Sequence, residues 1–177
     1  MINKIPELIN DLRMYQNGSK DNFISLKTLE FGEMAAVTAE LNAVGMAGKI
    51  EKPVIGHFEN LELTLTYQIP TETAITLCGG NEIEADLYAD VQGWDTGLNE
   101  YTHDQHFISF KGTAKSFDPG SLEPMNTSDA KNVIVYHWLK YEINGKELIY
   151  IDKYNYIFRV NGVDRMAVIR NNLRMGA

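Results

Sequence analysis

Strict alternation between apolar and polar residues constrains the fold more than any other feature of this chain. In Leu61–Tyr67 every second residue is apolar, and glutamate or threonine stands between. Ile83–Val91 repeats the pattern, and Gln105–Phe117 carries serine, lysine and threonine along one face. Because the side chains of a strand point alternately to its two faces, each run predicts a half-buried β-strand.

Two more strands are predicted over Asn132–Ile143 and Glu147–Val160. The Asn144-Gly145 pair between them is a strong hairpin signal, because a type I′ turn needs positive φ at both central residues. Asn17-Gly18 predicts a second turn near the start of the chain. The sequence therefore favours a mainly antiparallel β fold.

Helix signals are few. A short helix is predicted over Thr71–Cys78, which follows Pro70 and ends at Gly79-Gly80, and a second over Asp164–Met175 with Asp164 as N-cap. The spacing of Ile5, Leu8, Ile9 and Leu12 also matches one helical face, and Asp118–Lys131 has the composition of a surface loop. With no linker or internal repeat in its 177 residues, the chain is expected to form a single domain over residues 1–177.

Residues 42–58 separate the strand-like segments Ala35–Leu41 and Asn60–Ile69, and this spacing is too long for a tight hairpin turn. We expect an extended loop that contacts another subunit, because a free monomer would have to expose its apolar residues or fold them back. The alternative is a loop folded onto its own core. The candidate contact and hinge residues are Val44, Gly45, Met46, Gly48, Ile50, Pro53, Val54, Ile55 and Gly56.

The charge balance disfavours nucleic-acid binding. Sixteen Lys and Arg stand against 24 Asp and Glu, a net charge of −8 that repels phosphate backbones. Cys78 is the only cysteine, which excludes an internal disulfide and fits a reducing compartment. We find neither a signal peptide nor an apolar stretch near the roughly 18 residues that a membrane helix needs. Synthesis in a cytoplasm is therefore expected, with exit by lysis or as part of a particle.

No motif predicts catalysis, a metal or a cofactor. His103 and His106 lie three residues apart in a predicted strand, so they point to opposite faces, whereas a zinc site needs three or four convergent ligands. Cys78 follows a short helix instead of standing at a helix N-terminus, and a buried, inert thiol is expected there.

Three segments carry a resemblance to a known family. The opening INKIPELINDLRMY, the central GMAGKIEKPVIGHFENLELTLTY and the closing DKYNYIFRVNGVD with Arg165–Leu173 occur in the same order as in that family. The chain resembles the major tail tube protein of contractile-tailed phages and of R-type, pyocin-like phage-tail bacteriocins. Asp86–Lys131 matches it only in the rhythm of its strands.

The resemblance implies an antiparallel β-sandwich or partial barrel with a short flanking helix and a C-terminal helix. Six copies would close one sheet into a ring β-barrel, and the rings would stack into a hollow tube inside a contractile sheath. The 42–58 loop would then reach a neighbouring ring. Implied partners are the sheath protein and the baseplate or initiator, terminator and tape-measure proteins, and DNA would pass through the bore if the particle is a phage. The protein would assemble in the bacterial host cytoplasm and end in a virion or tail particle.

Tube assembly would place some strand residues on the bore. The lumen candidates are Thr38, Glu40, Asn42, Glu62, Thr64 and Thr66. Glu84, Asp86 and Asp90 form a second acidic row that lines the bore or faces outside. An acidic bore would repel a passing DNA backbone, whereas the alternative for all these acids is an ordinary solvated face. The arginines of the C-terminal helix either flank a helix packed on its own subunit or bind the acidic surface of a neighbour.

Two other functions remain open from the sequence alone. One is a small β-barrel that binds a ligand in its mouth through Trp94, Tyr101 and Trp138, although aromatic residues more often belong to a core. The other is a hydrolytic enzyme without a recognisable motif.

Overall fold

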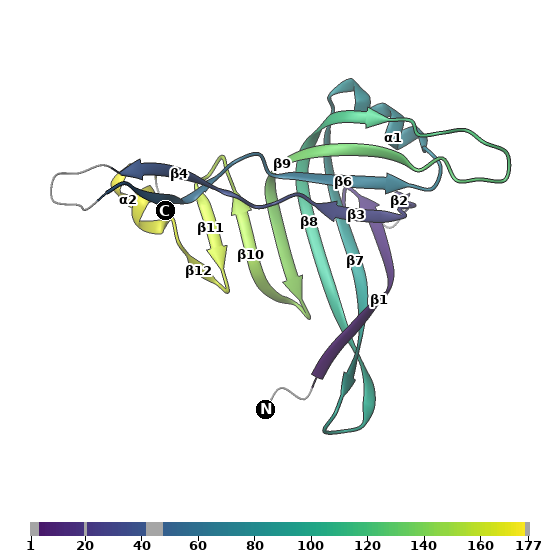
Figure 1. The fold of residues 1–177 in the computed structure, drawn as a ribbon, viewed down its shortest axis with the longest axis horizontal. Helices are drawn as coiled ribbons and strands as arrows, with labels where there is room; N and C mark the ends of the chain where they lie inside the picture. Colours follow the sequence, from purple (N-terminus) through teal and green to yellow (C-terminus); the bar gives the residue numbers. More distant parts are fainter. Residues whose placement is uncertain (1–3, 20, 42–47, 176–177) are drawn as a thin grey trace.

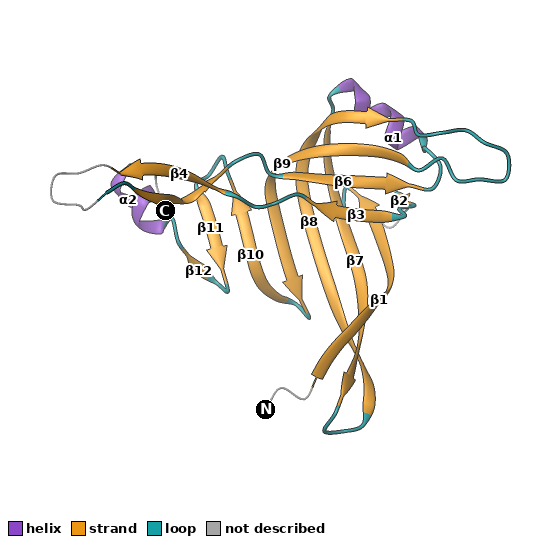
Figure 2. Cartoon of the chain, viewed as in Figure 1, coloured by secondary structure: helices purple, strands orange, loops and turns teal. Residues whose placement is uncertain are grey.

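A computed structural model of the protein describes residues 4–19, 21–41 and 48–175. Strands dominate these residues, and two short α-helices accompany them (Figure 2). The elements are β1 (Lys4–Gln16), β2 (Phe23–Ile24), β3 (Thr28–Phe31), β4 (Ala36–Leu41), β5 (Ile50–Phe58), β6 (Glu62–Tyr67), α1 (Glu72–Thr76), the 3-10 turn Leu77–Gly79, β7 (Glu82–Asp95), β8 (Glu100–Asp118), β9 (Ala130–Ile143), β10 (Lys146–Asp152), β11 (Ile157–Val160), β12 (Val163–Asp164) and α2 (Ala167–Asn172).

The main sheet is antiparallel throughout and divides at β9. Its strands follow the order β12-β11-β10-β9-β8-β7-β1-β2, and β6 pairs with the first half of β9 and with β3. The second half of β9 pairs instead with β10, so the sheet branches and curls around its inner face (Figure 1). The predicted mainly antiparallel fold, a β-sandwich or partial barrel, is confirmed, and the sheet does not close within one subunit.

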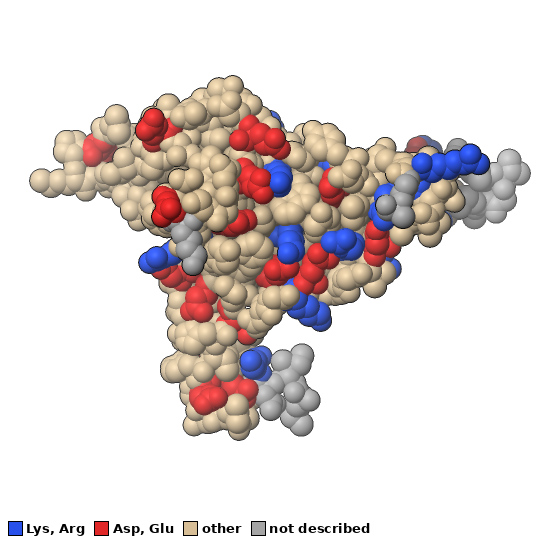
Figure 3. Space-filling model, turned by 180° about the vertical axis from the view of Figure 1, so that it is seen from behind, with Lys and Arg blue, Asp and Glu red and all other residues tan. Residues whose placement is uncertain are grey.

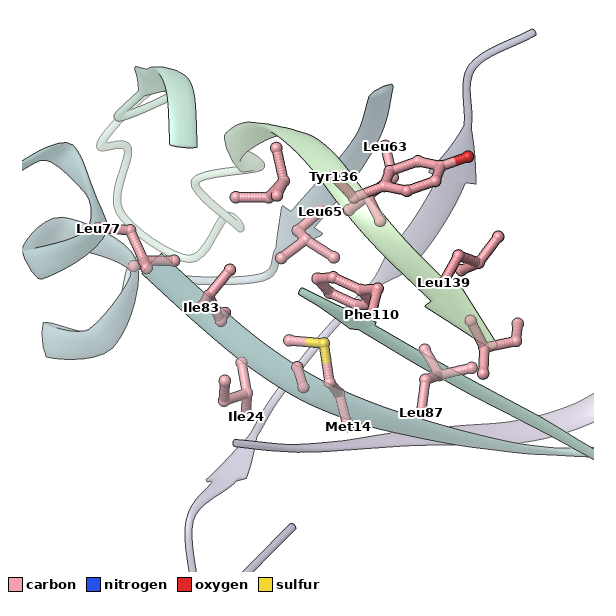
Figure 4. Packing of buried hydrophobic residues seen from close by; sticks show 14 of the residues in the cluster. Met14, Ile24, Leu63, Leu65, Leu77, Ile83, Leu87, Phe110, Tyr136 and Leu139 are labelled. Carbon is pink, nitrogen blue, oxygen red and sulfur yellow. The ribbon is translucent and has the colours of Figure 1, made fainter. Parts of the chain in front are cut away.

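The core lies inside this curl, where the alternating apolar residues of several strands meet. Met14, Leu65, Ile83 and Phe110 are fully buried and point toward one another (Figure 4). Each buried side chain of this size stabilises the fold by about 1.5–3 kcal/mol relative to an exposed one. Residues from α1 and from the 3-10 turn, among them Leu77, join the same cluster.

The short helix predicted over Thr71–Cys78 is present, but its α-helical part covers only Glu72–Thr76 and a 3-10 turn follows. The side chain of Thr71 accepts a hydrogen bond from the backbone N–H of Ala74, which caps the first turn of α1. Gly80 closes the following 3-10 turn in the left-handed conformation, with φ of 77°. The threonine cap therefore fixes the start of α1, and the glycine fixes the end of the 3-10 turn that follows it.

Strands β7 and β8 are longer than predicted and leave the core. With the first half of β1 they form a three-stranded extension, which we define as residues 4–11, 89–95 and 100–106 (Figure 1). Near its tip the ring of Trp94 contacts that of Tyr101 edge-on, with centroids 4.9 Å apart. The carboxylate of Asp95 accepts the backbone N–H groups of Gly97 and Leu98 and closes the turn.

The helical prediction for Ile5–Leu12 is wrong, because this segment lies within β1. Two β-bulges interrupt its pairing with β7, one between Pro6 and Leu8 and one between Ile9 and Asp11. Each bulge adds a residue and shifts the side-chain alternation. The shifted spacing of the apolar residues therefore imitates a helical period.

Two further boundaries differ from prediction. The Asn144-Gly145 turn is confirmed, with φ of 50° and 76°, but the strand expected over Glu147–Val160 is broken by a turn between β10 and β11. There Asp152 accepts the N–H of Asn155 at 3.0 Å. The C-terminal helix is also shorter than predicted, and its N-cap is Met166 instead of Asp164.

Candidate assembly surfaces

The segment predicted as an extended loop over 42–58 is a strand over more than half of its length. β5 pairs with β4 in a separate two-stranded hairpin, so the prediction of a loop is wrong for residues 50–58. Pro53 and Gly56 hid this strand, because both residues are rare inside a sheet but are tolerated in an edge strand. Of the candidate contact residues, Val44, Gly45 and Met46 lie outside the described residues, Gly48 precedes β5, and Ile50, Pro53, Val54, Ile55 and Gly56 lie on it.

The β4–β5 hairpin is amphipathic. Pairing places Leu41 opposite Ile50 on one face and Glu40 opposite Glu51 on the other. The polar face is held internally: Thr38 donates a hydrogen bond to Glu51, and Lys49 forms an ion pair with Glu40 at 3.0 Å. On the apolar face Leu41 is 42% exposed and Ile50 is 41% exposed. The hairpin therefore presents an apolar face that its own subunit leaves uncovered.

The base of the hairpin is seated against the C-terminal part of the chain. Phe58 contacts Phe158 of β11 edge-on, with ring centroids 4.9 Å apart. Gly56 has φ of 74°, and a side chain there would overlap the buried side chain of Met166, which precedes α2. Asp164 fixes this corner, since its carboxylate accepts the N–H of Met166 and pairs with Arg170 at 2.6 Å. The orientation of the hairpin is thus set by its base.

A second unpaired surface is the edge of β1. Within the described residues, its first ten positions pair only with β7, which leaves one row of backbone hydrogen-bonding groups free. Ile5, Leu8 and Ile9 are 53%, 49% and 62% exposed there. The sequence prediction missed this surface, because the same residues were interpreted as a helical face. Pro6 and the bulges restrict pairing at this edge to partners that match its register.

The lumen candidates lie on two separate elements. Thr38 and Glu40 belong to the hairpin, Asn42 lies outside the described residues, and Glu62, Thr64 and Thr66 lie on β6 in the body of the molecule. Glu62 forms an ion pair with Lys115 at 2.8 Å. Thr66 is only 6% exposed, so it offers little surface in an isolated subunit. The structure does not bring the two groups together within one chain (Figure 1).

The second acidic row lies along β7 on the face opposite the core. Glu84 pairs with Lys111 at 2.9 Å, and Asp90 accepts hydrogen bonds from Asn10 and from the His103 ring. These two partners hold the pKa of Asp90 below its usual range. The face is therefore a mixture of paired charges instead of a uniformly acidic surface.

Comparison with known proteins identifies the family. The family model described as phage tail tube protein FII matches residues 6–173, which is nearly the whole chain. The chain belongs to this family. The tail tube protein of Escherichia phage P2 is 33% identical over 66 residues, which cover 37% of this chain and 38% of that protein. The resemblance drawn from the three sequence segments is therefore confirmed.

The two histidines considered as metal ligands form hydrogen bonds with other side chains of the protein. His106 is hydrogen-bonded to the hydroxyl of Tyr141 at 2.7 Å, while His103 binds Asp90. Among the described residues, no three His, Cys, Asp or Glu side chains converge in a way that fits a metal ion. Cys78 is exposed, so the expectation of a buried thiol is wrong. No helix within the described ranges is long and apolar enough to cross a membrane.

The aromatic residues considered for a ligand-binding mouth do not converge. Trp94 and Tyr101 lie near the tip of the three-stranded extension, whereas Trp138 donates a hydrogen bond to the hydroxyl of Tyr150 on β10. The hollow beside Trp138, about 350 Å³ in volume, is lined by neither Trp94 nor Tyr101. The three aromatic residues therefore do not form one common ligand site.

Proposed function

We propose that this tail tube protein closes into hexameric rings that stack into a hollow inner tube, with the β4–β5 hairpin contacting the adjacent ring. The observation that carries the proposal is the uncovered apolar face of the hairpin, which stands outside the main sheet. Burial of such a face against another copy is favourable, because it removes apolar area from water. Family membership supports the same function.

Ring closure through sheet edges agrees with the open edge of β1. Pairing of this edge with a neighbour would satisfy its free backbone groups, and a closed ring leaves no edge for uncontrolled pairing. The surrounding partners would be the sheath protein and the baseplate or initiator, terminator and tape-measure proteins. DNA would cross the bore only if the particle is a phage. Assembly in the host cytoplasm and release by lysis complete the proposal.

The bore would be lined by the candidate residues Thr38, Glu40, Asn42, Glu62 and Thr64, with Thr66 at their margin. Carboxylates among them would keep a DNA backbone from adhering during passage. A density map of the assembled tube tests this assignment directly. Carboxylates of Glu40 and Glu62 that face outward in the map would refute it.

The hairpin contact is tested by a double substitution on its apolar face, Leu41→Ser with Ile50→Ser. Negative-stain microscopy should show that the variant forms no rods, because the contact loses its apolar area. Sedimentation should show a compact, folded subunit. The matched control is Glu40→Gln with Glu51→Gln on the polar face, which should still form rods. Deletion of Gly45–Val54 provides a second variant with the same expected loss. Rods of normal length from both apolar-face variants would contradict the proposal.

A further inference from the structure

Basic residues are concentrated in the C-terminal segment of the chain, near one end of the molecule's longest axis. Residues 153–175 contain Lys153, Arg159, Arg165, Arg170 and Arg174 against a single acid, Asp164, within a chain of net charge −8. This segment forms β11, β12 and α2 next to the β4–β5 hairpin, at one end of the longest axis (Figure 1). We call this region the basic end. Seen from behind, Lys and Arg side chains lie at this end beside some acidic ones, and others lie over the middle of the molecule (Figure 3).

The opposite end is acidic. There α1 and the loop of residues 118–129 lie together, tied by a hydrogen bond from the Ser128 N–H to the Gln68 carbonyl at 2.7 Å (Figure 1). Residues 71–82 contain two glutamates and residues 118–129 three acids, and neither segment contains a lysine or arginine. We call these two segments the acidic end. Lys27, which pairs with Asp129 at 3.0 Å, and Lys131, which follows in β9, leave the charge balance of this end negative.

Several charges at both ends are unpaired in the free subunit. Arg165 and Arg174 at the basic end are exposed and form no ion pair with any described residue, and the same holds for Glu72 and Glu123 at the acidic end. Ion pairs elsewhere join neighbouring strands, for example Lys111 with Glu84. These four charges lie near opposite ends of the molecule, so one subunit cannot pair the two arginines with the two glutamates internally.

The acidic end also presents apolar side chains on an ordered support. Ser128 closes the neck of the loop by donating its hydroxyl to the Pro119 carbonyl at 2.7 Å and accepting the Ser121 N–H at 3.0 Å. Beyond this neck Leu122 is 86% exposed and Met125 is fully exposed.

At the basic end Ile55, Val168 and Leu173 are 61%, 69% and 56% exposed. Each end thus combines unpaired charge with uncovered apolar side chains, a composition suited to a specific contact between proteins.

We infer that the acidic end of one copy docks on the basic end of the next. Charge complementarity sets the orientation, and the apolar side chains on both ends supply buried area. Because two different surfaces meet, the contact is heterologous and propagates from copy to copy into a ring or a filament. The inference rests on the proposed function and assigns a partner surface to the hairpin end of the subunit.

Charge reversal of each end tests the contact. One variant carries Glu72→Lys with Glu123→Lys, and the other carries Arg165→Glu with Arg174→Glu. All four side chains are exposed, so both variants should melt like the wild type. Light scattering and microscopy should show that each variant alone needs at least about tenfold more protein to form rods, because its two ends now repel. Lys146→Glu, at the exposed first residue of β10, is the control and should assemble like the wild type.

An equimolar mixture of the two variants is the decisive arm. The altered ends of the two variants carry opposite charges and complement each other, and so do their native ends, so the mixture should form rods of alternating variants near the wild-type concentration. Rods from each variant alone at the wild-type concentration would overturn the proposed contact. The two ends would then bind another component of the particle instead. Failure of the mixture to restore rods would also overturn the contact. Wild-type protein that forms no rods would instead refute the proposed function itself.

Discussion

Two tyrosine hydroxyls are buried in the core and have no hydrogen-bond partner among the described residues. Tyr67 and Tyr136 are 0% and 1% exposed. Burial raises the pKa of both phenols, that of Tyr136 to about 12, because the charged phenolate is poorly solvated there. Their folded pKa values therefore exceed the unfolded value of about 10. This contribution to stability is complete below about pH 10 and is lost as the pH rises toward 12.

At the residue scale we predict that Tyr136→Phe stabilises the protein. Removal of an unpaired buried hydroxyl should raise the free energy of unfolding by about 1 kcal/mol and shift alkaline unfolding to higher pH. Urea denaturation at pH 7 and at pH 11 measures both effects. Tyr101→Phe, at an exposed position, is the control and should change neither. A destabilised Tyr136→Phe variant would show that the hydroxyl has a partner in solution.

The hairpin is an element whose direction depends on a few contacts at its base. Gly56 combines a left-handed backbone with close approach of the Met166 side chain, which would lie 2.2 Å from an added Cβ. Two residues later, Phe58 at the end of β5 packs against Phe158 of β11. A change at Gly56 should therefore alter how the hairpin leaves the body while the main sheet stays intact.

At the element scale we predict that Gly56→Ala costs about 2–4 kcal/mol of stability. About 1–2 kcal/mol comes from the left-handed backbone and the rest from displacement of Met166. Gly145→Ala is a matched control, because Gly145 has nearly the same φ of 76° but open space around it. Thermal denaturation of both variants isolates the packing cost as their difference, and rod formation should weaken only in Gly56→Ala. Equal losses of stability in the two variants would contradict the proposed packing of Gly56 against Met166.

The whole molecule distributes its stability unevenly. The central strands β6, β7, β8 and β9 share one buried cluster, whereas the hairpin and the first half of β1 carry exposed apolar residues and open edges. Local opening is easiest where few apolar contacts hold a segment. The surfaces assigned to assembly are thus the least stable parts of the free subunit.

At the scale of the molecule we predict a specific change in hydrogen exchange on assembly. In the free subunit the amides of β4, β5 and residues 4–11 should exchange much faster than those of β8 and β9. In assembled rods the first group should become protected, since neighbours cover it, while the core changes little. Mass spectrometry of both forms measures this. A hairpin that is already protected in the free subunit would contradict its role as an uncovered contact.

The sequence predicts the core strands of the fold better than it predicts the assembly surfaces. The alternation in Leu61–Tyr67 and Ile83–Val91 indicated the correct strands, because burial of one face imposes a period of two. The Asn144-Gly145 turn followed from backbone sterics. The apolar residues of 50–55 were identified as uncovered, but their strand was not, since Pro53 and Gly56 masked it.

The sequence by itself determined the alternating strands of the core, the turn at Asn144 and the family, because these depend on residues that are near one another in the chain or on their order. Tertiary structure alone decided that residues 5–12 form a bulged edge strand, that Gly56 seats against Met166, and that the two charged ends lie apart. These features depend on which distant segments meet, and no local pattern encodes a contact between residues a hundred positions apart.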